Sequence, residues 1–505
     1  MLCTLACTLL SIFAAATNDP PPPGPYFPLK PADHEKARTF KSGQPIIGTT
    51  YFYWYDVTTG AHIIDHDGTD ALTTHPPKEW MKDCTWRSVD WHERQLRDML
   101  TARIDFLMPV YWGVPGVKEG WCNEGIPLLL EAYDRLMAEH LQDQATVPDG
   151  GPRRIRPAPP KIGMFYDTST LRQNRVIGPA FHPGEHMDLT TPRGRAFFYN
   201  TIRDFFSLVP PDKWARIDGR PIVFLYGADH ARAVDEKLFD DTRERFRRDF
   251  GCDLFLVRNS DWPGRADAWY DWGGAIYPKY GDAVVAMGPG YDHSAVPGRE
   301  PLITPREGGR FYQRSWERFL QMDPDSRPWI VHIETWNEWH EATDIARSEE
   351  YGDQYIRMTA EYAMKFHRRE RLEAKGPFTG RREIRWTPRE SDGLTALPPL
   401  GDGCWEPVSV ETKGGNDAVR IVECSPPQAA RFIYFDVADS FLFGPPRGTT
   451  VEVDVEFWDD GGCAHFRIDY DNSNPNIGPR GGAFRPTEPV RVGKTGKLRT
   501  ATFRL

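Results

Sequence analysis

The chain has 505 residues, 40% of them hydrophobic, which predicts two or three domains with buried cores and excludes a disordered chain. Its 72 acidic and 62 basic residues give a net charge of −10, which argues against a nucleic-acid partner, because phosphates attract a basic surplus. Aromatic residues reach 13%, with 17 tryptophans, an excess that suits proteins whose flat rings pack on the apolar faces of sugars.

The chain begins with an apolar segment, Met1–Thr17, that ends in small residues. This pattern predicts a secretory signal peptide cleaved near Ala14–Ala16, and hence a secreted, extracellular or periplasmic protein. The basic start of such a peptide is missing, so an ordinary apolar tail is the alternative. Residues 18–44, with the proline run Pro20–Pro23, are expected to form a stiff spacer. We expect no membrane span, because no other stretch reaches about 20 apolar residues.

Short apolar runs alternate with amphipathic segments over residues 45–373. The eight runs predicted as strands are Pro45–Trp54, Ile104–Trp112, Lys161–Asp167, Pro221–Gly227, Asp253–Arg258, Trp272–Tyr277, Ala283–Met287 and Trp329–Thr335. The predicted helices are Val89–Ala102, Ile126–Leu141, Arg195–Leu208, Val234–Phe250, Tyr312–Met322 and Asp353–Glu373. Eight alternating strands predict an α/β fold, a TIM (β/α)8 barrel. A doubly wound open sheet is the alternative, but the glycine-rich dinucleotide turn is missing.

The pattern changes after the barrel region. Residues 374–395 are polar and rich in Arg, Gly and Pro, which predicts a linker. Residues 396–505 carry short strand patterns without helical periodicity, which predicts a β-sandwich. Its aromatic residues Trp405, Tyr434, Phe435 and Trp458 either form a carbohydrate-binding platform or pack in its core. The segment Asp469–Asn476 is interpreted as a turn, with a calcium loop as the alternative.

The cysteines define no metal site. No C-x-x-C or H-E-x-x-H motif is present, so we expect no metal and no cofactor. Disulfide pairing cannot be deduced, because each of the two regions holds an odd number after the leader. These six are Cys84, Cys122 and Cys252, then Cys404, Cys424 and Cys463.

Aromatic and polar residues follow the predicted strands. In a TIM barrel, the ends of the strands carry the reacting and binding residues, so these side chains predict a carbohydrate cleft. For Asp56 and Asp167, capping of the next segment is the alternative. The candidate substrate-binding residues are Trp54, Tyr55, Asp56, Tyr111, Trp112, Tyr166, Asp167, Tyr226, Tyr277, Tyr291, Trp336, Asn337, Trp339 and His340.

The segment Glu334–Glu341 (ETWNEWHE) follows the eighth predicted strand. On a helical turn, Glu338 and Glu341 would share a face. Two carboxylates close together do not both stay ionised, so one can act as acid and the other as base or nucleophile, as glycoside hydrolysis requires. Both are therefore the predicted catalytic residues. The alternative is a pair of solvated glutamates at a helix N-terminus.

Several motifs together resemble glycoside hydrolase family 99, the endo-α-mannosidases and endo-α-mannanases. They are Met287–His293 (MGPGYDH), Thr335–Thr343 (TWNEWHEAT), Tyr51–Tyr55 (YFYWY) with His75-Pro76, and Ile104–Trp112. The likeness covers about residues 46–360, and the chain is interpreted as a member of a sister group with its own C-terminal domain. It implies an endo-acting, retaining enzyme without a cofactor, and an active-site tyrosine at Tyr277 or Tyr280.

The resemblance also implies the roles of the two glutamates. Glu338 would deprotonate the 2-hydroxyl of the sugar, whose oxygen attacks C1 to form a 1,2-anhydro sugar. Glu341 would protonate the leaving oxygen and then activate water. The chain departs from the family at the third strand, where Asp167 stands in place of a Glu-Pro-Tyr acid that contacts substrate. This departure concerns the α-mannoside specificity more than the reaction type.

The sequence thus predicts a secreted, monomeric glycoside hydrolase that acts on a polysaccharide or glycan. A non-catalytic carbohydrate-binding protein would explain the same aromatic residues, but it needs no pair of adjacent carboxylates. A processing enzyme or transferase of polysaccharide biosynthesis is a third hypothesis. The predicted leader and the lack of a sugar-nucleotide motif disfavour it.

Overall fold

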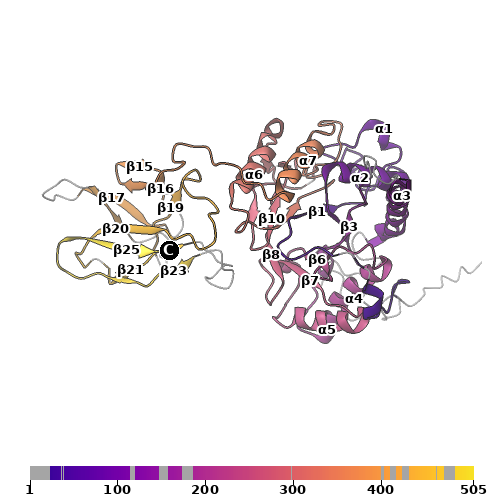
Figure 1. Cartoon of the computed structure of the whole chain (residues 1–505), viewed down its shortest axis with the longest axis horizontal. Coiled ribbons are helices and arrows are strands. Elements are labelled where there is room, and N and C mark those ends of the chain that lie inside the picture. The colour runs from indigo at the N-terminus through magenta and orange to yellow at the C-terminus, as the bar shows by residue number, and fades with distance from the viewer. Residues whose placement is uncertain are drawn as a thin grey trace, which may run out of the picture. The chain divides into compact units, whose positions relative to one another are not determined.

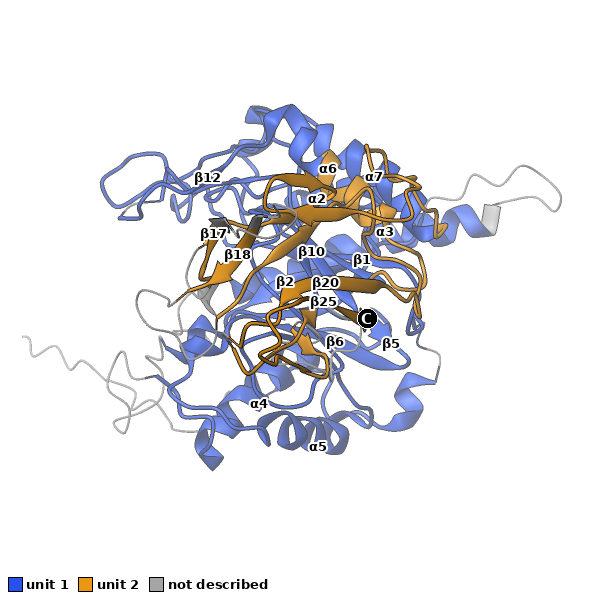
Figure 2. Ribbon diagram, turned by 90° about the vertical axis from the view of Figure 1, so that its left-hand side faces the viewer, with its two compact units in different colours: residues 1–312, 328–367 blue, residues 313–327, 368–505 orange. Residues whose placement is uncertain are grey.

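The structure is a computed structural model of the chain. It describes residues 23–113 apart from 36 and 38, 120–146, 157–172, 186–399 apart from 297, 403–409, 417–422, 431–470 apart from 462, and 484–505. The predicted signal peptide, most of the proline run and most of the candidate calcium loop lie outside these residues. The chain divides into two compact units, Met1–Tyr312 with Pro328–His367, and Gln313–Arg327 with Arg368–Leu505 (Figure 2).

Unit 1 is built on a nearly closed, barrel-like sheet of parallel strands (Figure 1). Its strands are β1 (Ile46–Tyr51), β2 (Phe106–Tyr111), β4 (Met164–Tyr166), β6 (Arg220–Leu225), β7 (Phe255–Asn259), β8 (Ala268–Tyr270), β10 (Val284–Met287) and β13 (Ile330–Ile333). They pair in chain order, and β13 closes the circle onto β1. Among the described residues, no ladder joins β8 to β10. The arrangement is that of a mixed α/β, TIM-like barrel.

Short strands extend this sheet or lie beside it. β3 (Lys161–Ile162) pairs with β2, while β5 (Arg216–Ile217) and β9 (Lys279–Tyr280) run antiparallel to β6 and β10. β11 (Tyr291–Asp292) and β12 (Ile303–Thr304) form a separate hairpin. The 3-10 turns are η1 (Pro31–His34), η2 (Gly120–Glu124), η3 (Thr168–Leu171), η4 (Ala228–His230) and η5 (Glu307–Gly309).

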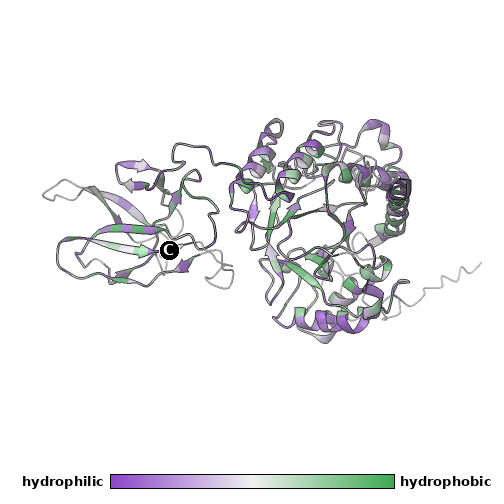
Figure 3. Cartoon of the chain, viewed as in Figure 1, coloured by the Kyte–Doolittle hydropathy of each residue, from purple (hydrophilic) through white to green (hydrophobic). Residues whose placement is uncertain are grey.

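The barrel strands are the core of unit 1. All residues of β1, β2, β10 and β13 are buried. Continuous burial is what a parallel sheet requires when side chains cover both of its faces, which explains why these runs are apolar throughout instead of alternating. Figure 3 shows the hydrophobic strands and the more polar outer surfaces of the helices around them.

The helices are α1 (Lys78–Met81), α2 (Val89–Ala102), α3 (Gly125–Thr146), α4 (Pro192–Leu208), α5 (Leu238–Phe250), α6 (Arg310–Gln321) and α7 (Gln354–His367). Local chemistry sets their ends. Ser88 caps α2 by accepting the Trp91 N–H, and Thr191 caps α4, which starts with a proline. α7 ends at His367, six residues before the predicted end, and Arg369 just beyond it has a φ of 56°.

The predicted strand Trp272–Tyr277 is wrong. The sixth barrel strand is β8, which ends at Tyr270, and the next segment turns across the end of the barrel. Gly273 has a φ of 104°, outside the strand region, and a Cβ on Gly274 would lie 2.4 Å from the carbonyl carbon of Ala286. The two glycines therefore allow a close turn against β10 that no strand could make. No helix separates β7, β8 and β10, all of whose connecting residues are described.

The C-terminal residues of unit 2 form antiparallel pairs of strands. The pairs are β14 (Arg385–Thr387) with β15 (Glu390–Asp392), β16 (Leu394–Ala396) with β19 (Phe435–Val437), β17 (Trp405–Ser409) with β18 (Asp417–Ile421), β20 (Glu452–Trp458) with β25 (Leu498–Arg504), β21 (His465–Phe466) with β24 (Val490–Arg491), and β22 (Asp469–Tyr470) with β23 (Arg485–Pro486). Each ladder has two strands among the described residues, so a sandwich stays a prediction. Trp386 packs edge-on against Trp405 and Phe435, two of the residues of the predicted platform.

Among the cysteines, Cys404 is disulfide-bonded, whereas Cys84 and Cys252 are free thiols.

None of the helices in the described ranges combines the length and the apolar character needed to cross a bilayer.

The packing of Gly48 in the barrel generates a prediction. Gly48 stands beside Phe106 in the β1–β2 register, and a Cβ on Gly48 would lie 2.2 Å from the Phe106 ring. Phe106 is fully buried between the rings of Phe40 and Phe224 and has little room to move. We expect Gly48→Ala to lower the free energy of unfolding by about 1–3 kcal/mol in denaturant titrations. Phe106→Leu in the Gly48→Ala background should recover part of this loss, and full stability of the single variant would contradict the packing.

Candidate active site

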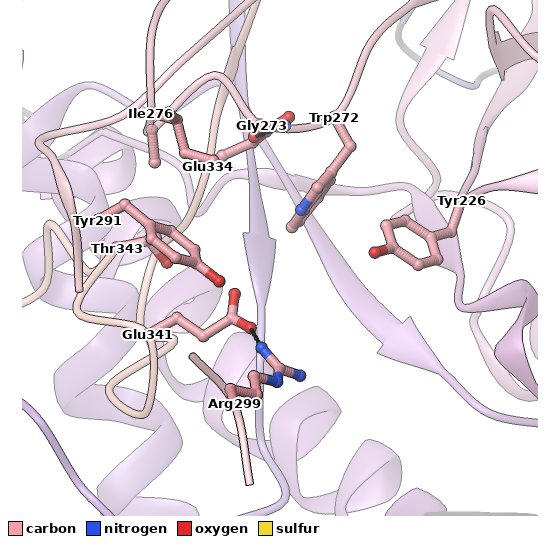
Figure 4. Close-up of a pocket in the computed structure, with 10 residues that line it drawn as sticks. Tyr226, Trp272, Gly273, Ile276, Tyr291, Arg299, Glu334, Glu341 and Thr343 are labelled. Carbon is pink, nitrogen blue, oxygen red and sulfur yellow. Dashed lines mark hydrogen bonds and ion pairs between the residues drawn. The ribbon is translucent and has the colours of Figure 1, made fainter. Parts of the chain in front are cut away.

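A cavity of ≈ 190 Å³ lies at the carboxyl ends of the barrel strands (Figure 4). Tyr226 follows β6, Trp272 follows β8 and Glu334 follows β13, so residues just after the strand ends form part of its lining. The complete lining is Tyr226, Trp272, Gly273, Ala275, Ile276, Tyr291, Arg299, Glu334, Glu341 and Thr343. This is the end of a barrel at which catalytic residues occur.

Glu341 is one of two carboxyl groups in the cavity wall. Its Oε1 lies 2.6 Å from Nη1 of Arg299, as the dashed line in Figure 4 shows. Burial lowers the pKa of Arg299, but Glu341 beside it outweighs this and the net pKa is raised. Burial and the nearby Glu341 both raise the pKa of Tyr291, which keeps its hydroxyl neutral. The wall therefore contains a carboxylate, its cation and a phenol that holds its proton.

Glu334 is the second carboxyl group of the wall and is only 1% exposed. Its Oε2 accepts the N–H groups of Gly273 at 2.8 Å and Gly274 at 2.7 Å. Its Oε1 has no hydrogen-bond partner among the described residues. Burial raises the pKa of Glu334 to about 8, although the two N–H groups and Lys279 act in the opposite direction. Burial therefore favours the neutral form of Glu334 over the carboxylate.

His332 lies beneath Glu334 in the interior of the barrel. Its Nε2 is 2.7 Å from Oγ1 of Thr50, and its Nδ1 is 3.7 Å from Oε1 of Glu334, too far for a hydrogen bond. Burial among the rings of Phe224 and Tyr270 lowers the pKa of His332 to about 3. The imidazole is therefore neutral and supplies no positive charge to Glu334.

Glu338 does not line the cavity and is held beside it. Its Oε1 is 2.7 Å from Nδ1 of His340 and 3.5 Å from the Tyr55 hydroxyl. Its Oε2 has no partner among the described residues. Burial lowers the pKa of His340, but Glu338 and, more weakly, Glu341 outweigh it, and the net pKa is raised. One imidazole thus experiences the charge of both glutamates.

The predicted helical turn that carries these glutamates is wrong. Residues 334–346 form a loop that contains no helix, and side chains bind several of its backbone groups. Thr335 accepts the Glu338 N–H at 2.8 Å, and Arg306 donates to the Ala342 carbonyl at 2.9 Å. The side chains therefore diverge: Glu338 faces His340, whereas Glu341 faces Arg299 in the cavity.

Asn337 fixes this loop to the end of β1. Its Oδ1 accepts the Phe52 N–H at 2.8 Å, and its Nδ2 donates to the Phe52 carbonyl at 2.6 Å. Both bonds are buried, so the amide of Asn337 has a positioning role and is not available to a substrate. Tyr55 adds two contacts to the same loop, since its hydroxyl donates to the Asn337 carbonyl and accepts the Trp339 N–H.

Three rings form a stack beside Glu338 and His340. Trp54 is stacked on His62, with ring centroids 4.1 Å apart, and on Trp112 at 5.2 Å. The Nε1 of Trp112 donates to Asp167 at 2.8 Å, and Asp167 also caps η3 through the Ser169 N–H. Asp167 thus orients Trp112 and caps the next segment, as the alternative interpretation of this residue expected. The stack lies on the side of His340, whose ring contacts Trp54 and His62.

Six of the predicted substrate-binding rings are at most 3% exposed, and four of these pack against the helices outside the barrel. Successive side chains of a strand point to opposite faces, so Tyr111 and Tyr166 point outward and pack on Phe205 and Phe198 of α4. Trp336 donates to Gln95 of α2, and Trp339 packs on Trp91 of the same helix. We therefore correct the prediction for Tyr111, Tyr166, Trp336 and Trp339, which stabilise the barrel from its outer side.

Three further predicted residues lie away from the cavity. Asp56 is buried and accepts hydrogen bonds from Thr58, Thr59 and Arg87, so it holds its own turn together. Tyr277 is 56% exposed and its hydroxyl binds Lys279. Tyr280 lies in β9 and is not part of the lining. Of the predicted residues, the cavity contains Tyr226, Tyr291 and Glu341.

Seven of the ten lining residues were missed by the sequence analysis, among them Glu334, Trp272 and Arg299. Glu334 directly follows an apolar strand, the position at which TIM barrels carry reacting groups, so the signal was present. Trp272 was assigned to the interior of a strand that does not exist. Arg299 stands in a polar loop without periodicity, so no pattern indicates its role. No group of three or more potential metal ligands occurs in the part of the chain that the structure describes.

Comparisons with known proteins give one family and several structures. Residues 37–377 match the family "Domain of unknown function (DUF5010)". No curated protein matches the chain. Similar solved structures include the GH99 endo-alpha-mannosidase from Bacteroides thetaiotaomicron with Bis-Tris propane, at 17% identity and a TM-score of 0.44 over 65% of this chain and 99% of that one.

Two further structures are similar. A second structure of the Bacteroides thetaiotaomicron enzyme has 17% identity and a TM-score of 0.43, covering 64% of this chain and 98% of that one. A glycoside hydrolase-like protein has 14% identity and a TM-score of 0.40, covering 64% and 95%. The family that the sequence motifs resemble is thus among the similar structures. The TM-scores of these three structures are below 0.5, so we derive the function from the site itself.

The two hydrogen bonds between the Asn337 amide and the Phe52 backbone, here called the Asn337 clamp, generate a prediction. Asn337→Ala leaves the buried N–H and carbonyl groups of Phe52 without partners. Each unsatisfied group costs about 1–3 kcal/mol. We expect a loss of about 2–5 kcal/mol in the free energy of unfolding of unit 1, measured by denaturant titration. Asn200→Ala on the half-buried face of α4 is the matched control and should change little. Equal effects of the two substitutions would contradict the clamp.

Glu334 gives the stability of unit 1 a pH dependence. Its pKa is about 8 in the folded chain and 4.5 when unperturbed, so the stability that its proton provides is complete below pH 4.5 and lost as the pH rises through 8. Glu334→Gln carries no such loss. The variant should exceed the wild type by about 2–4 kcal/mol at pH 8, with the difference vanishing near pH 4.5, as followed by calorimetry. A difference that does not depend on pH would contradict the buried, neutral acid.

Proposed function

The chain belongs to the DUF5010 family of domains of unknown function, and we propose that it is a glycoside hydrolase that cleaves a polysaccharide or glycan. The observation that carries this proposal is the position of Glu338 and Glu341. They lie at the carboxyl end of a TIM-like barrel, where Glu338 contacts His340 and Glu341 contacts Arg299 in a partly open cavity with aromatic residues in its lining. Most enzymes that cleave glycosidic bonds use two carboxyl groups at such a site.

We assign the base role to Glu338. Its Oε2 has no hydrogen-bond partner among the described residues, so its lone pairs are not engaged by the protein, but it is sealed from solvent and a substrate hydroxyl reaches it only when neighbouring side chains move. His340, bonded to Oε1, orients the carboxylate. In the mechanism that the resemblance to family 99 implies, Glu338 takes the proton of the 2-hydroxyl. The oxygen of that hydroxyl then attacks C1 as the bond from C1 to the leaving oxygen breaks.

We assign the acid role to Glu341, which donates its proton to the leaving oxygen. In the absence of a substrate this carboxylate is paired with Arg299, whose side chain is 49% exposed at the solvent side of the pair. A sugar that enters the cavity and displaces Arg299 would leave Glu341 desolvated and without its cation, which favours its protonated form. In the second step Glu341 takes a proton from water, the water oxygen attacks C1, the C1–O2 bond opens, and Glu338 returns the proton to O2.

The finer features of this proposal concern the substrate and the location. We propose endo-action on an α-mannoside-like substrate, with retention of configuration at C1, by a secreted monomer that requires no cofactor. Tyr226, Trp272 and Tyr291 would surround the bound sugar, with the Trp54 stack at its His340 side. The aromatic walls fit the apolar faces of a sugar ring, and the hydroxyls and the indole N–H fit its edges.

Substitution of the two glutamates tests the proposal. We expect Glu338→Gln and Glu341→Gln each to lower the release of reducing sugar by at least about 100-fold, because each removes a group that transfers a proton. The substrates are α-mannan and a panel of plant and microbial polysaccharides. The matched control is Glu361→Gln on the exposed surface of α7, which should cleave as fast as the wild type.

Either glutamine variant cleaving at the wild-type rate would overturn the assignment of that residue. Glycan binding by calorimetry without turnover on any member of the panel would favour a carbohydrate-binding protein instead. Binding of a nucleotide sugar would favour a transferase.

A further inference from the structure

Arg299 is the cation among the residues that line the cavity. Its Nη1 lies 2.6 Å from Oε1 of Glu341, and its side chain is 49% exposed, so the guanidinium is open to solvent beside the pair. Figure 4 shows it next to Glu341, with Trp272 and Tyr226 across the same space. One of its nitrogens serves the carboxylate, and a guanidinium has several N–H donors. A ligand in the cavity therefore meets Arg299 directly.

The backbone next to Arg299 is held by contacts that do not involve its side chain. His293 is buried, with its Nδ1 3.0 Å from the Tyr291 hydroxyl and its Nε2 2.7 Å from the Glu300 carbonyl. Glu300 follows Arg299 directly in the chain. The backbone of Arg299 is therefore held at the cavity independently of the ion pair with Glu341.

The proposed reaction takes the carboxylate of Glu341 away from Arg299. Glu341 must hold a proton before it can give one to the leaving oxygen, and a neutral carboxylic acid does not balance the charge of a guanidinium. In the free protein the two charges of the pair compensate each other. In the reacting complex Arg299 keeps its positive charge and needs another partner.

The other two glutamates of the same loop do not supply this partner. Glu334 is held by the glycine turn after β8, and Oε1 of Glu338 lies 2.7 Å from Nδ1 of His340. Within the described ranges, Arg299 forms its ion pair with Glu341 alone. The protein therefore offers no second carboxylate at this position of the cavity among these residues.

Water does not supply it either once a glycan is bound. A polysaccharide that fills the cavity covers the exposed part of the Arg299 side chain. A cation that loses both its water and its carboxylate is costly, because nothing compensates its desolvation. The compensating anion is therefore expected on the substrate itself.

We infer that Arg299 is a specificity-determining residue and that the substrate is an acidic glycan, whose carboxylate or sulfate group replaces Glu341 at the guanidinium. This inference rests on the proposed function and names the substrate class of the same site. Both groups present neighbouring oxygen acceptors, which fit the fork of N–H donors of an arginine. As the anion of the substrate pairs with Arg299, Glu341 takes up a proton from the solvent, so the cavity stays balanced in charge.

The charge of the whole chain works against such a substrate. With a net charge of −10, the protein repels a polyanion at long range. A preference for an anionic glycan over its neutral counterpart would therefore come from a local cation and not from the overall charge.

Matched polysaccharides test the inference. The probes are α-mannan, the same α-mannan partly oxidised to carboxylates at C6, and the same α-mannan partly sulfated, all at one ionic strength. We expect the wild type to have a kcat/KM at least about tenfold higher on one of the two anionic forms than on α-mannan, because hydrogen bonds between charged groups are the stronger ones. The preferred form identifies the anion as a carboxylate or a sulfate.

Arg299→Gln is the decisive variant, since it removes the charge and keeps a polar side chain. The ratio of kcat/KM on the preferred anionic form to that on α-mannan should fall by at least about tenfold, to near unity. Because it is a ratio, it cancels any general effect of the substitution on Glu341. Arg299→Lys keeps the charge without the fork and should give an intermediate ratio.

Arg97→Gln is the matched control. Arg97 on α2 pairs with Glu93 at 2.7 Å, and the two side chains are 43% and 21% exposed, close to the 49% and 21% of Arg299 and Glu341. It lies outside the cavity lining. Its substitution should leave the wild-type ratio in place.

Two results would overturn the inference and leave the hydrolase function intact. One is cleavage of α-mannan by the wild type at least as fast as of both anionic forms, a result that needs no variant. The other is an Arg299→Gln protein that keeps the wild-type ratio.

If the wild type cleaves none of the three probes, the proposed hydrolysis of α-mannan fails and binding decides the substrate class. Calorimetry then compares polygalacturonate with its carboxyl-reduced form, and a sulfated galactan with its desulfated form. The wild type and Arg97→Gln should bind one charged member at least about tenfold more tightly than its neutral counterpart, whereas Arg299→Gln should not. Equal affinities within both pairs, or a preference that survives in Arg299→Gln, would overturn the inference.

Discussion

The site depends on one constraint, the attachment of the loop 334–346 to the end of β1. The Asn337 side chain replaces a missing strand neighbour for Phe52 by pairing with both its N–H and its carbonyl group. Because the loop contains no helix, this clamp and the contacts of Tyr55 help to determine where its glutamates point. The strands β1 and β13 are hydrogen-bonded neighbours, and the clamp adds a further link between the segments that follow them.

From this loop, three glutamates reach three different environments. Glu334 enters the glycine turn after β8, Glu338 contacts His340, and Glu341 contacts Arg299. Separate environments allow chemically identical side chains to act as base and acid at one pH. The proposed hydrolysis assigns these two roles to Glu338 and Glu341.

Much of this fold could be predicted from the sequence, and the limits have physical causes. Seven of the eight barrel strands and the bounds of α2 followed from apolar runs and helical periodicity. The turn at Gly273 was mistaken for a strand because its apolar composition does not reveal a φ of 104°.

In the site, Tyr111 and Tyr166 were misplaced because the sequence gives the end of a strand only to within a residue. One residue inverts the direction of a side chain, so the rings point to α4 while Trp112 and Asp167 point inward. The distant partner Arg299 could not be predicted, since its contact with Glu341 spans two loops.

The most direct test of the account is a crystal structure of the Glu341→Gln variant soaked with an oligosaccharide of the α-mannan that the panel contains. The account predicts a sugar ring in the ≈ 190 Å³ cavity, with O2 within hydrogen-bond distance of Glu338 and the leaving oxygen beside residue 341. An empty cavity, with the sugar bound only to the strands of residues 385–505, would contradict it.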